Sequence, residues 1–427
     1  MSTAGTTAPP ASPSQTSELK RLATTPAVLC LMLFSAAYVT NAMDRTIFST
    51  LLPMISKTHG YGLSSGGFLS TIFNLGIGII GLPAGFLLDR WSRKSVLVLG
   101  MIIYSVATLA TIFAVGFVDM AMYRAVTGIG EGMQIAALYV AAGSYFYKNK
   151  AFVVGCINVG FGVGATLGPY WGARIAVAVG TWKTPFAVFC VAGLVMAAAV
   201  WFIVPRNFSE QRAISNVRDA SIVVDNIPEQ FFNRNVKLLM MSVFVLGTVG
   251  YGYQGLYVTF LVRHLHYTTV MAATAFSFYG FGCMLPMLGG WLGDRFSNRG
   301  ALITAYACMA LITYLLFNVA TTLTEHCILS FLQAFFYSST LHVNHLALFQ
   351  RSVRPHMVGR ATGLFTSTHF ISGSFAGYLL GSLAGKLGWG TAALIQETSL
   401  SIAAIIVLLM INPKLQLSVR NKLAGGH

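Results

Sequence analysis

Residues 85–94 read GFLLDRWSRK, and residues 290–299 read GWLGDRFSNR. Both stretches place a glycine four residues before an Asp-Arg pair and continue with further basic side chains, and their aspartates are 294 − 89 = 205 residues apart. A small residue lets two helices approach, an aspartate can bind a neighbouring helix end, and a basic cluster anchors at a membrane surface. The duplication predicts two similar halves. We expect its charged residues to act as gates: Asp89, Arg90, Arg93, Asp294 and Arg295.

The composition is that of a chain embedded in lipid, because 55% of its 427 residues are hydrophobic and only 9% are charged. A helix needs about 20 apolar residues to cross a bilayer. Apolar segments of this kind fall near 26–56, 64–88, 95–117, 120–147, 151–179, 184–205, 236–262, 268–293, 300–319, 324–350, 358–385 and 388–411. The sequence therefore predicts an all-α integral membrane protein with twelve transmembrane helices, six in each half.

Polar segments divide the chain into five parts. Residues 1–25 are rich in Ser, Thr, Pro and Ala and predict a disordered cytoplasmic tail. An N-terminal six-helix half at 26–205 and a C-terminal half at 236–411 are joined by a polar linker at 206–235, and 412–427 form a second tail. The first apolar stretch is a full span, so we expect no cleavable signal peptide.

The basic residues indicate the orientation of the chain, because cytoplasmic loops collect Lys and Arg. With the N-terminus inside, 20 of the 27 Lys and Arg residues lie on the inner side, and the outer loops hold only Lys57, Lys183, Arg263 and Lys386. We therefore expect both termini to be cytoplasmic, in the cell (inner) membrane. The net charge of +15 reflects this topology rather than a surface for nucleic acid.

At the two repeated stretches the chain resembles the major facilitator superfamily, whose members carry this pattern after the second helix of each half. The resemblance covers residues 26–411, and one departure is Ser92, where the family usually has glycine. It implies a secondary transporter that works by alternating access and needs no cofactor. We expect it to act as a monomer.

Two pairs of charged residues lie inside apolar segments: Asp44 with Arg45, and Arg124 with Glu131. Charges within a membrane are costly, so they mark a candidate functional site. Seven residues separate Arg124 from Glu131, which places both on one helix face about 10 Å apart. The alternative for Glu131 is a structural pair with Arg124.

With Asn41, these residues resemble the anion:cation symporter family, which carries organic anions such as galactonate and, in its sialin branch, sialic acid. The resemblance implies that Arg45 contacts the anion. It also implies that Asp44 and Glu131 carry protons, and we place Arg124 in the same coupling network. The expected partners are a small organic carboxylate, protons and membrane lipid.

Other polar and aromatic side chains in the apolar segments are candidate substrate contacts. Tyrosines four apart share a helix face with an adjoining glutamine, and neutral histidines can hydrogen bond or titrate. Packing is the alternative for each of them. No carboxylate or cysteine accompanies the histidines, so we expect no metal site. The full set of candidate contacts is Tyr38, Asn41, Arg45, Gln134 (before Ile135), Tyr253, Gln254, Tyr257, His342, His345 and His369.

Other functions fit parts of the sequence. The Asp-Arg pair and the Gly130-Glu131 pair also resemble spinster-type carriers of lipids or larger amphipathic substrates, which would need a broad apolar cavity. The glycines of 160–172 resemble those of proton-coupled drug antiporters. No arginine lies inside 236–262, which counts against a sugar phosphate. No constellation of an intramembrane enzyme is evident, and a transport-silent sensor would be separated by flux assays. We expect Glu397 to be a packing or lipid-interface residue.

Overall fold

The computed structural model describes residues 22–211, 227–413 and 415. Within them all regular structure is helical, as predicted. Most of the expected N-terminal tail, the middle of the linker and nearly all of the C-terminal tail lie outside the described residues. Of the described helices, nine are long and apolar enough to cross a membrane, and ten if one bent pair counts as a single crossing.

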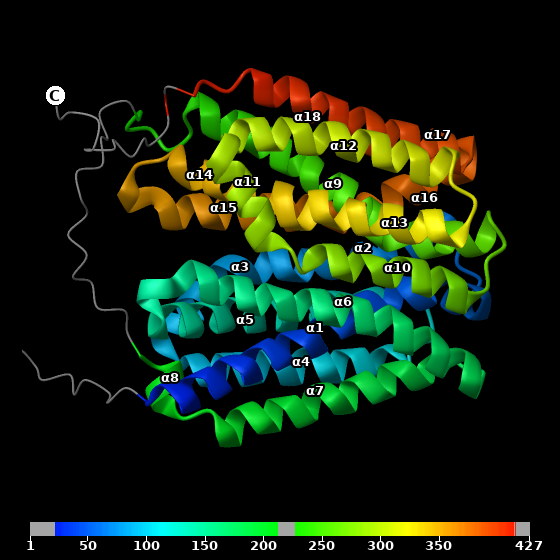
Figure 1. The fold of residues 1–427 in the computed structure, drawn as a ribbon. Helices are drawn as coiled ribbons and strands as arrows, with labels where there is room; N and C mark the ends of the chain where they lie inside the picture. The colour runs from blue at the N-terminus through cyan, green and yellow to red at the C-terminus, as the bar shows by residue number, and fades with distance from the viewer. Residues whose placement is uncertain (1–21, 212–226, 414, 416–427) are drawn as a thin grey trace, which may run out of the picture.

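The first half of the chain forms the lower group of helices in Figure 1. Gly60 and Gly180 end α1 and α6 in the left-handed conformation, with φ of 71° and 80°, which favours glycine. Ser92 caps α4 by accepting from the amide of Ser95, so serine serves in place of the usual glycine. The helices are α1 (Thr24–His59), α2 (Leu63–Thr71), α3 (Phe73–Arg90), α4 (Arg93–Thr111), α5 (Phe117–Tyr145), α6 (Lys150–Val179) and α7 (Lys183–Ile203), followed by the short α8 (Arg206–Ser209).

The second half forms the upper group, and its spans are more often interrupted. The expected span 268–293 bends by 50° between α10 and α11, where Pro286 begins the new helix. The expected spans 324–350 and 358–385 are also divided, the first by a π-helix, which explains why fewer than twelve single helices reach membrane length. The elements are α9 (Arg234–Arg263), α10 (Thr269–Cys283), α11 (Pro286–Phe296), α12 (Asn298–Asn318), α13 (Leu323–Ala334), the π-helix η2 (Phe335–His342), α14 (Val343–Arg351), α15 (Val358–Ser374), α16 (Ala376–Leu387), α17 (Trp389–Ala393), the π-helix η4 (Leu394–Ser399) and α18 (Leu400–Leu409).

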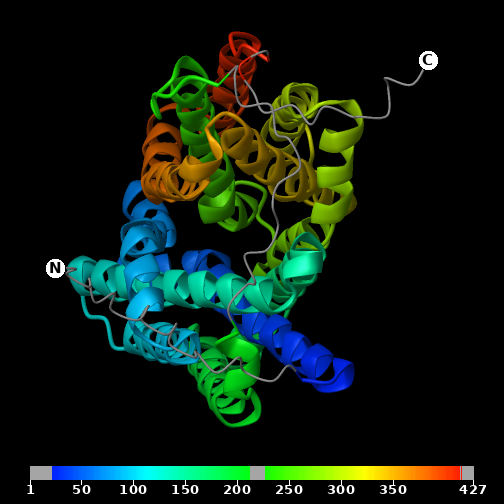
Figure 2. The ribbon, with the colours of Figure 1, turned by 90° about the vertical axis from the view of Figure 1, so that its left-hand side faces the viewer.

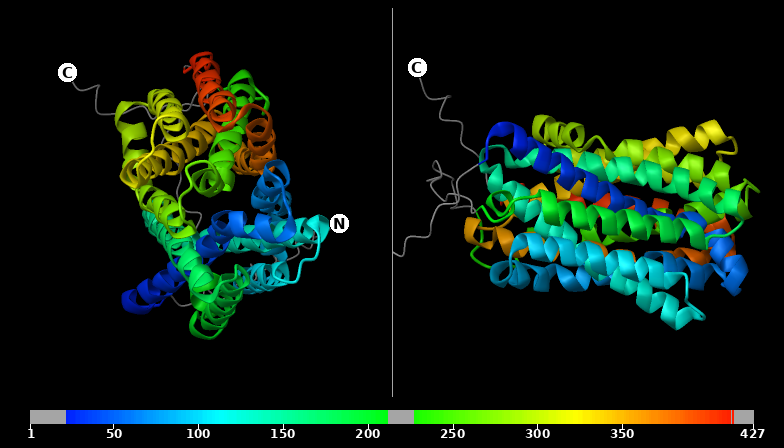
Figure 3. Two further views of the ribbon diagram at one scale, coloured as in Figure 1. Left: turned by 90° about the vertical axis from the view of Figure 1, so that its right-hand side faces the viewer. Right: turned by 90° about the horizontal axis from the view of Figure 1, so that it is seen from below.

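The two groups lie side by side in the views along the helices in Figures 2 and 3. They meet where α1 packs on α9, α2 on α16, α3 on α15, and α6 on α10. Glycines make the closest of these contacts: a Cβ atom on Gly67 of α2 would lie 2.0 Å from the carbonyl oxygen of Gly377 on α16. Thr71 adds a hydrogen bond of 2.8 Å to the carbonyl oxygen of Ser374. This α2–α16 contact closes one end of the interface.

The interface opens toward the other end, where the repeated loops lie. Along α3, a Cβ on Gly78 would be 3.0 Å from Ile371 of α15, and one on Gly81 would be 3.9 Å from Thr366. A Cβ on Gly85, one turn further, would meet nothing within 4 Å. The helices α3 and α15 therefore diverge toward the end that carries Asp89, while the α2–α16 end is shut.

Candidate substrate and proton site

Arg45 lies at the middle of α1 and joins α1 to α5. Its Nε atom donates to Oε2 of Glu131 at 3.1 Å, and its Nη2 atom is 3.4 Å from Oδ1 of Asn41. Arg45 is only 6% exposed and Glu131 is fully buried. A buried ion pair is held strongly once formed, because breaking it leaves an uncompensated charge.

Two amides hold this arginine in place. Asn41 donates to Oε1 of Gln134 at 2.8 Å, and Gln134 donates to the carbonyl oxygen of Ala37 at 2.9 Å. Both amides are fully buried. Gln134 was a predicted substrate contact, but the structure uses both ends of its amide to fix α5 against α1.

Asp44 and Arg124 form no ion pair with each other or with Arg45 and Glu131 at 4.0 Å or less. Asp44 accepts from the hydroxyl of Thr108 on α4 at 2.8 Å, and its second oxygen has no partner among the described residues. Arg124 is fully buried, and its three nitrogens bond to nothing described. Its guanidinium instead lies over the rings of Phe48 and Phe73, at 4.7 and 5.2 Å.

This pairing differs from the alternative that the sequence left open for Glu131, a structural pair with Arg124. Glu131 pairs with Arg45 of a neighbouring helix rather than with Arg124 of its own helix. Asp44 does not orient Arg45, because successive residues of a helix point about 100° apart. Phe73 links the two arginines, since its ring lies 5.7 Å from the Arg45 guanidinium as well as below Arg124.

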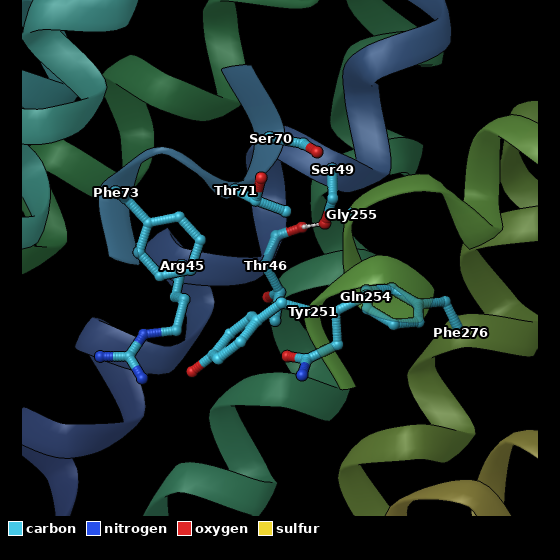
Figure 4. A pocket seen from close by; sticks show the side chains of 10 residues that line it. All are labelled: Arg45, Thr46, Ser49, Ser70, Thr71, Phe73, Tyr251, Gln254, Gly255 and Phe276. Carbon is cyan, nitrogen blue, oxygen red and sulfur yellow. Dashed lines mark hydrogen bonds between the residues drawn. The ribbon is translucent and has the colours of Figure 1, made fainter. Parts of the chain in front are cut away.

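A small cavity lies next to Arg45 at the junction of the two halves, and Figure 4 shows its lining. Its volume is about 10 Å³, the space of about one water molecule. The guanidinium of Arg45, the hydroxyl of Tyr251 and the amide of Gln254 point the same way in Figure 4. The lining residues are Arg45, Thr46, Ser49, Ser70, Thr71, Phe73, Tyr251, Gln254, Gly255 and Phe276.

The predicted contacts on α9 divide between this cavity and the core of the second half. Gln254 lines the cavity. Tyr253 and Tyr257 are fully buried and turn toward α13, where Tyr253 donates to Ser330 at 3.0 Å and Tyr257 is 2.9 Å from Nδ1 of His326. The structure therefore places these two tyrosines away from Arg45, and the cavity instead takes Tyr251.

The three predicted histidines differ in their surroundings. His345 is fully satisfied, with Nε2 at 2.8 Å from Ser242 and Nδ1 at 2.9 Å from the carbonyl oxygen of Leu341, so it packs rather than binds. His369 lies beside the ring of Tyr251, with centroids 5.5 Å apart. His342 is half-buried and touches His369 edge to face, at 5.0 Å. None of the three lines the cavity described above.

Tyr38 also lies off the cavity, two helical turns before Arg45 on α1. Its ring packs against Phe161 of α6, at 5.5 Å, and against Tyr139 of α5, at 6.1 Å. Tyr139 donates to Asn158 at 2.7 Å, and both are half-buried. Tyr38 therefore joins α1 to α5 and α6 by aromatic packing.

The repeated loops differ between the halves. Asp294 pairs with Arg351 at 3.2 Å, whereas Asp89 is exposed and has no ion pair of 4.0 Å or less within the described ranges. Arg93 donates its backbone amide to Glu210 and its side chain to the carbonyl oxygen of Gln211. Arg90 and Arg295 are exposed at the same end of the bundle.

Several residues of the site were not predicted from the sequence. Thr108, the partner of Asp44, carries no signal on its own helix, and Phe73 looks like any apolar residue of a span. Ser70 and Thr71 form a polar pair just before the break at Ile72, which was a usable signal. Tyr251 is one of several tyrosines in α9, but the spacing of Tyr253 and Tyr257 predicted a substrate contact on the face of α9 that packs on α13 instead.

The chain matches the Major Facilitator Superfamily over residues 34–287 and 239–425. It is 24% identical to the hexuronate transporter of Bacillus subtilis (strain 168) over 91% of this chain and 94% of that protein. It is 25% identical to the probable L-galactonate transporter of Escherichia coli (strain K12), over 86% of this chain and 84% of the relative. A solved bacterial homologue of the human lysosomal transporter spinster, inward-facing and occupied, aligns with a TM-score of 0.68 and 16% identity over 91% of this chain and 96% of its own.

The chain therefore belongs to the Major Facilitator Superfamily, as the repeated stretches predicted. It is a multi-pass membrane transporter rather than an enzyme. The resemblance to the galactonate and sialin-like branch is confirmed by its relatives.

Proposed function

We propose that this protein carries a small organic anion with one carboxylate across the membrane, in symport with protons. In this proposal it works as a monomer in the inner membrane, with both termini cytoplasmic and two halves, 26–205 and 236–411, that rock about the central site. A sugar acid is the substrate class that its relatives suggest, since they are named for hexuronate and L-galactonate.

One observation carries the proposal. A buried arginine beside the interface of the two halves is paired with a carboxylate that a substrate anion can replace. The Nε atom of Arg45 donates a hydrogen bond to Glu131, and Figure 4 shows the guanidinium beside the hydroxyl of Tyr251. An arginine matches a carboxylate in a bidentate manner, so a substrate carboxylate is a direct competitor of Glu131.

This competition provides a mechanism for coupling. When the substrate takes Arg45, Glu131 becomes a buried carboxylate without a counterion, and such a group is relieved by a proton. Release of the proton restores the Arg45–Glu131 pair and expels the anion. By linkage, proton and substrate then favour each other's binding. Asp44 is a second buried acid, bonded to Thr108 through one oxygen only, which can carry a proton in the same cycle.

The cavity favours a small polar substrate over an amphipathic one. Six of its ten lining residues carry a hydroxyl or amide side chain: Thr46, Ser49, Ser70, Thr71, Tyr251 and Gln254. The hydroxyls of Thr46, Ser49 and Ser70 donate to carbonyl oxygens of their own helices, so they face a substrate as acceptors. Acceptors and an arginine together suit a hydroxylated carboxylate, whereas a lipid carrier would need a broad apolar cavity.

A thermal-shift assay on purified protein tests the substrate class, because a ligand that binds the folded state raises the melting temperature. We expect glucuronate and galactonate to stabilise the protein, and glucose, which has the hydroxyls without the carboxylate, to have no effect. Stabilisation by lysophospholipid and by neither acid would favour the amphipathic alternative.

The pocket face of α9 predicts a difference between two tyrosines. Tyr251→Phe removes a hydroxyl beside Arg45 and should weaken glucuronate binding by about 1 kcal/mol, or roughly fivefold. Tyr253→Phe removes a hydroxyl bonded to Ser330 in the core and should leave the affinity unchanged. Isothermal titration of both variants checks this, and equal losses in both would place the substrate elsewhere.

The open end predicts a gating role for Asp89. If this side chain binds the beginning of α15 when α3 and α15 come together, Asp89→Asn removes the charge that favours the closed inner end. We expect Asp89→Asn to increase cysteine labelling of the inner approach while substrate binding persists. Asp119→Asn, on the opposite end, serves as the control. Unchanged labelling in Asp89→Asn would assign Asp89 a structural role.

A further inference from the structure

Glu397 is a buried carboxyl group that the transport site does not use. It lies in the π-helix η4 near the middle of the last span and is fully buried, so of the two roles expected from the sequence, packing and lipid interface, it does not have the second. Neither of its oxygens has a hydrogen-bond partner among the described residues, and no described basic side chain lies within 4.0 Å. An ionised carboxylate in such a place is very costly, whereas a neutral carboxylic acid is not.

Its position is fixed by a glycine of α9. A Cβ atom on Gly252 would lie 2.4 Å from Oε1 of Glu397 and 2.4 Å from Nε2 of Gln396, so both side chains reach α9 only because position 252 has no side chain. Gln396 donates to the carbonyl oxygens of Thr248 on α9 and of Ala376 on α16. This amide therefore ties together α9 and α16.

These two helices are the ones that shut the closed end of the interface. Gly377 of α16 packs on Gly67 of α2, and Gly255 of α9 faces Ser70 and Thr71 of the same α2 region, with a Cβ at 255 only 2.7 Å from the Ser70 hydroxyl. Gly252 and Gly255 are three residues apart and share a face of α9, so Glu397 lies against α9 about one helical turn from the contact with α2.

Among the described residues, the surroundings of Glu397 supply no other charge. The elements packed on η4 are α9, α12, α17 and α18, and Gln396 also reaches α16, where Tyr378 and Lys386 are exposed. The sequences of α17 and α18 contain no titratable residue, and α9 brings Gly252 between Tyr251 and Tyr253. In α12, Tyr306 bonds to Ser242, Cys308 and Tyr314 are partly exposed, and Arg299 bonds to the carbonyl oxygens of Leu408 and Leu409 at the far end.

One route leads from Glu397 toward the substrate site. Tyr337 of η2 packs on α9 at Gly250, two residues from Gly252, against which Glu397 lies. Its hydroxyl is 3.4 Å from Nε2 of His369, and the ring of His369 lies against Tyr251 beside Arg45. The route begins at η4 and passes through η2, and π-helices of this kind often occur at functional sites.

We propose that Glu397 is a proton-binding site of the C-terminal half, occupied while the α2–α16 end is closed as it is here. Loss of the proton would leave a bare charge about one helical turn from the contact of α9 with α2, and separation of these helices would let water reach that charge. The ligand is a proton, and no substrate is needed for the inference.

Infrared spectroscopy of the full-length protein in lipid tests the proton directly. In Glu131→Gln protein labelled with 13C-glutamate, Glu397 is the one fully buried glutamate of the described residues, so its carboxyl band is separable without mutating it. We expect a protonated carboxylic-acid band at neutral pH, in sodium-free and in sodium-containing buffer alike, that disappears in the further variant Glu397→Gln. An ionised carboxylate band at neutral pH, or a protonated band lost on adding sodium, would overturn the assignment and indicate a cation site.

Labelling of the closed end tests the link to gating. In a background without the native cysteines, Ser70→Cys reports access from the α2–α16 end to an impermeant maleimide. We expect labelling to rise with pH in protein that retains Glu397 and to stay low at every pH after Glu397→Gln. Glu229→Gln, which changes an exposed carboxylate, should behave like the parent. An identical pH dependence with and without Glu397 would contradict the proposal.

Discussion

Arg45→Lys is expected to abolish most substrate binding while the protein still inserts and purifies. The guanidinium has three neighbours at once. Its Nε atom donates to Glu131, its Nη2 atom is near Asn41, and the group lies beside the hydroxyl of Tyr251. A lysine ammonium is a point charge and cannot hold Glu131 while presenting a planar fork to a second carboxylate. We expect the affinity for glucuronate to fall at least tenfold, about 1.4 kcal/mol or more, in isothermal titration.

Arg206→Lys is the matched control for this variant, because Arg206 is exposed at the beginning of α8 and away from the site. Its affinity should equal that of the parent. If Arg45→Lys binds glucuronate like the parent, the anion does not bind at Arg45. The proposed competition between substrate and Glu131 for Arg45 would then be wrong as well.

Glu131→Gln should separate binding from coupling. The amide is nearly isosteric with a protonated carboxylic acid, and its oxygen can still accept from Nε of Arg45, so the arginine stays in place. A permanently neutral residue cannot cycle a proton. We therefore expect glucuronate binding and exchange across proteoliposomes to persist, while accumulation driven by a pH gradient is lost.

Glu229→Gln serves as the control here too, since this exposed carboxylate pairs with Arg354 outside the site. Accumulation by Glu131→Gln at the parental level would make the Arg45–Glu131 pair purely structural. Asp44→Asn should also reduce accumulation, because Asp44 is a fully buried acid with one oxygen that has no partner among the described residues, and we expect it to carry a proton.

The sequence predicted the features that depend on one helix or on repetition. The energetic cost of a charge inside a membrane is enough to indicate a functional site at Asp44, Arg45, Arg124 and Glu131. The duplicated stretch around Asp89 and Asp294 predicts two halves. The sequence could not predict which charged residues pair, because Glu131 meets Arg45 only through the packing of α5 on α1. Adjacent residues such as Asp44 and Arg45 diverge around a helix, so closeness in sequence suggested the wrong pair.

Most interruptions of the helices in the second half could not be predicted from the sequence either. Pro286 indicates the bend between α10 and α11, but the π-helices at 335–342 and 394–399 contain no proline or glycine. The sequence left Glu397 as either a packing or a lipid-interface residue, because its burial depends on the missing side chain at Gly252, which lies on another helix. Glycines of α9 are where polar side chains of neighbouring helices enter the core.

The most direct test of coupled transport is uptake of radiolabelled glucuronate into proteoliposomes with and without an inward proton gradient. The competition between substrate and Glu131 for Arg45 predicts accumulation above the outside concentration only with the gradient, abolished by a protonophore. It also predicts that Glu131→Gln equilibrates the substrate without concentrating it. Accumulation that persists without a proton gradient, or that Glu131→Gln performs as well as the parent, would contradict the account.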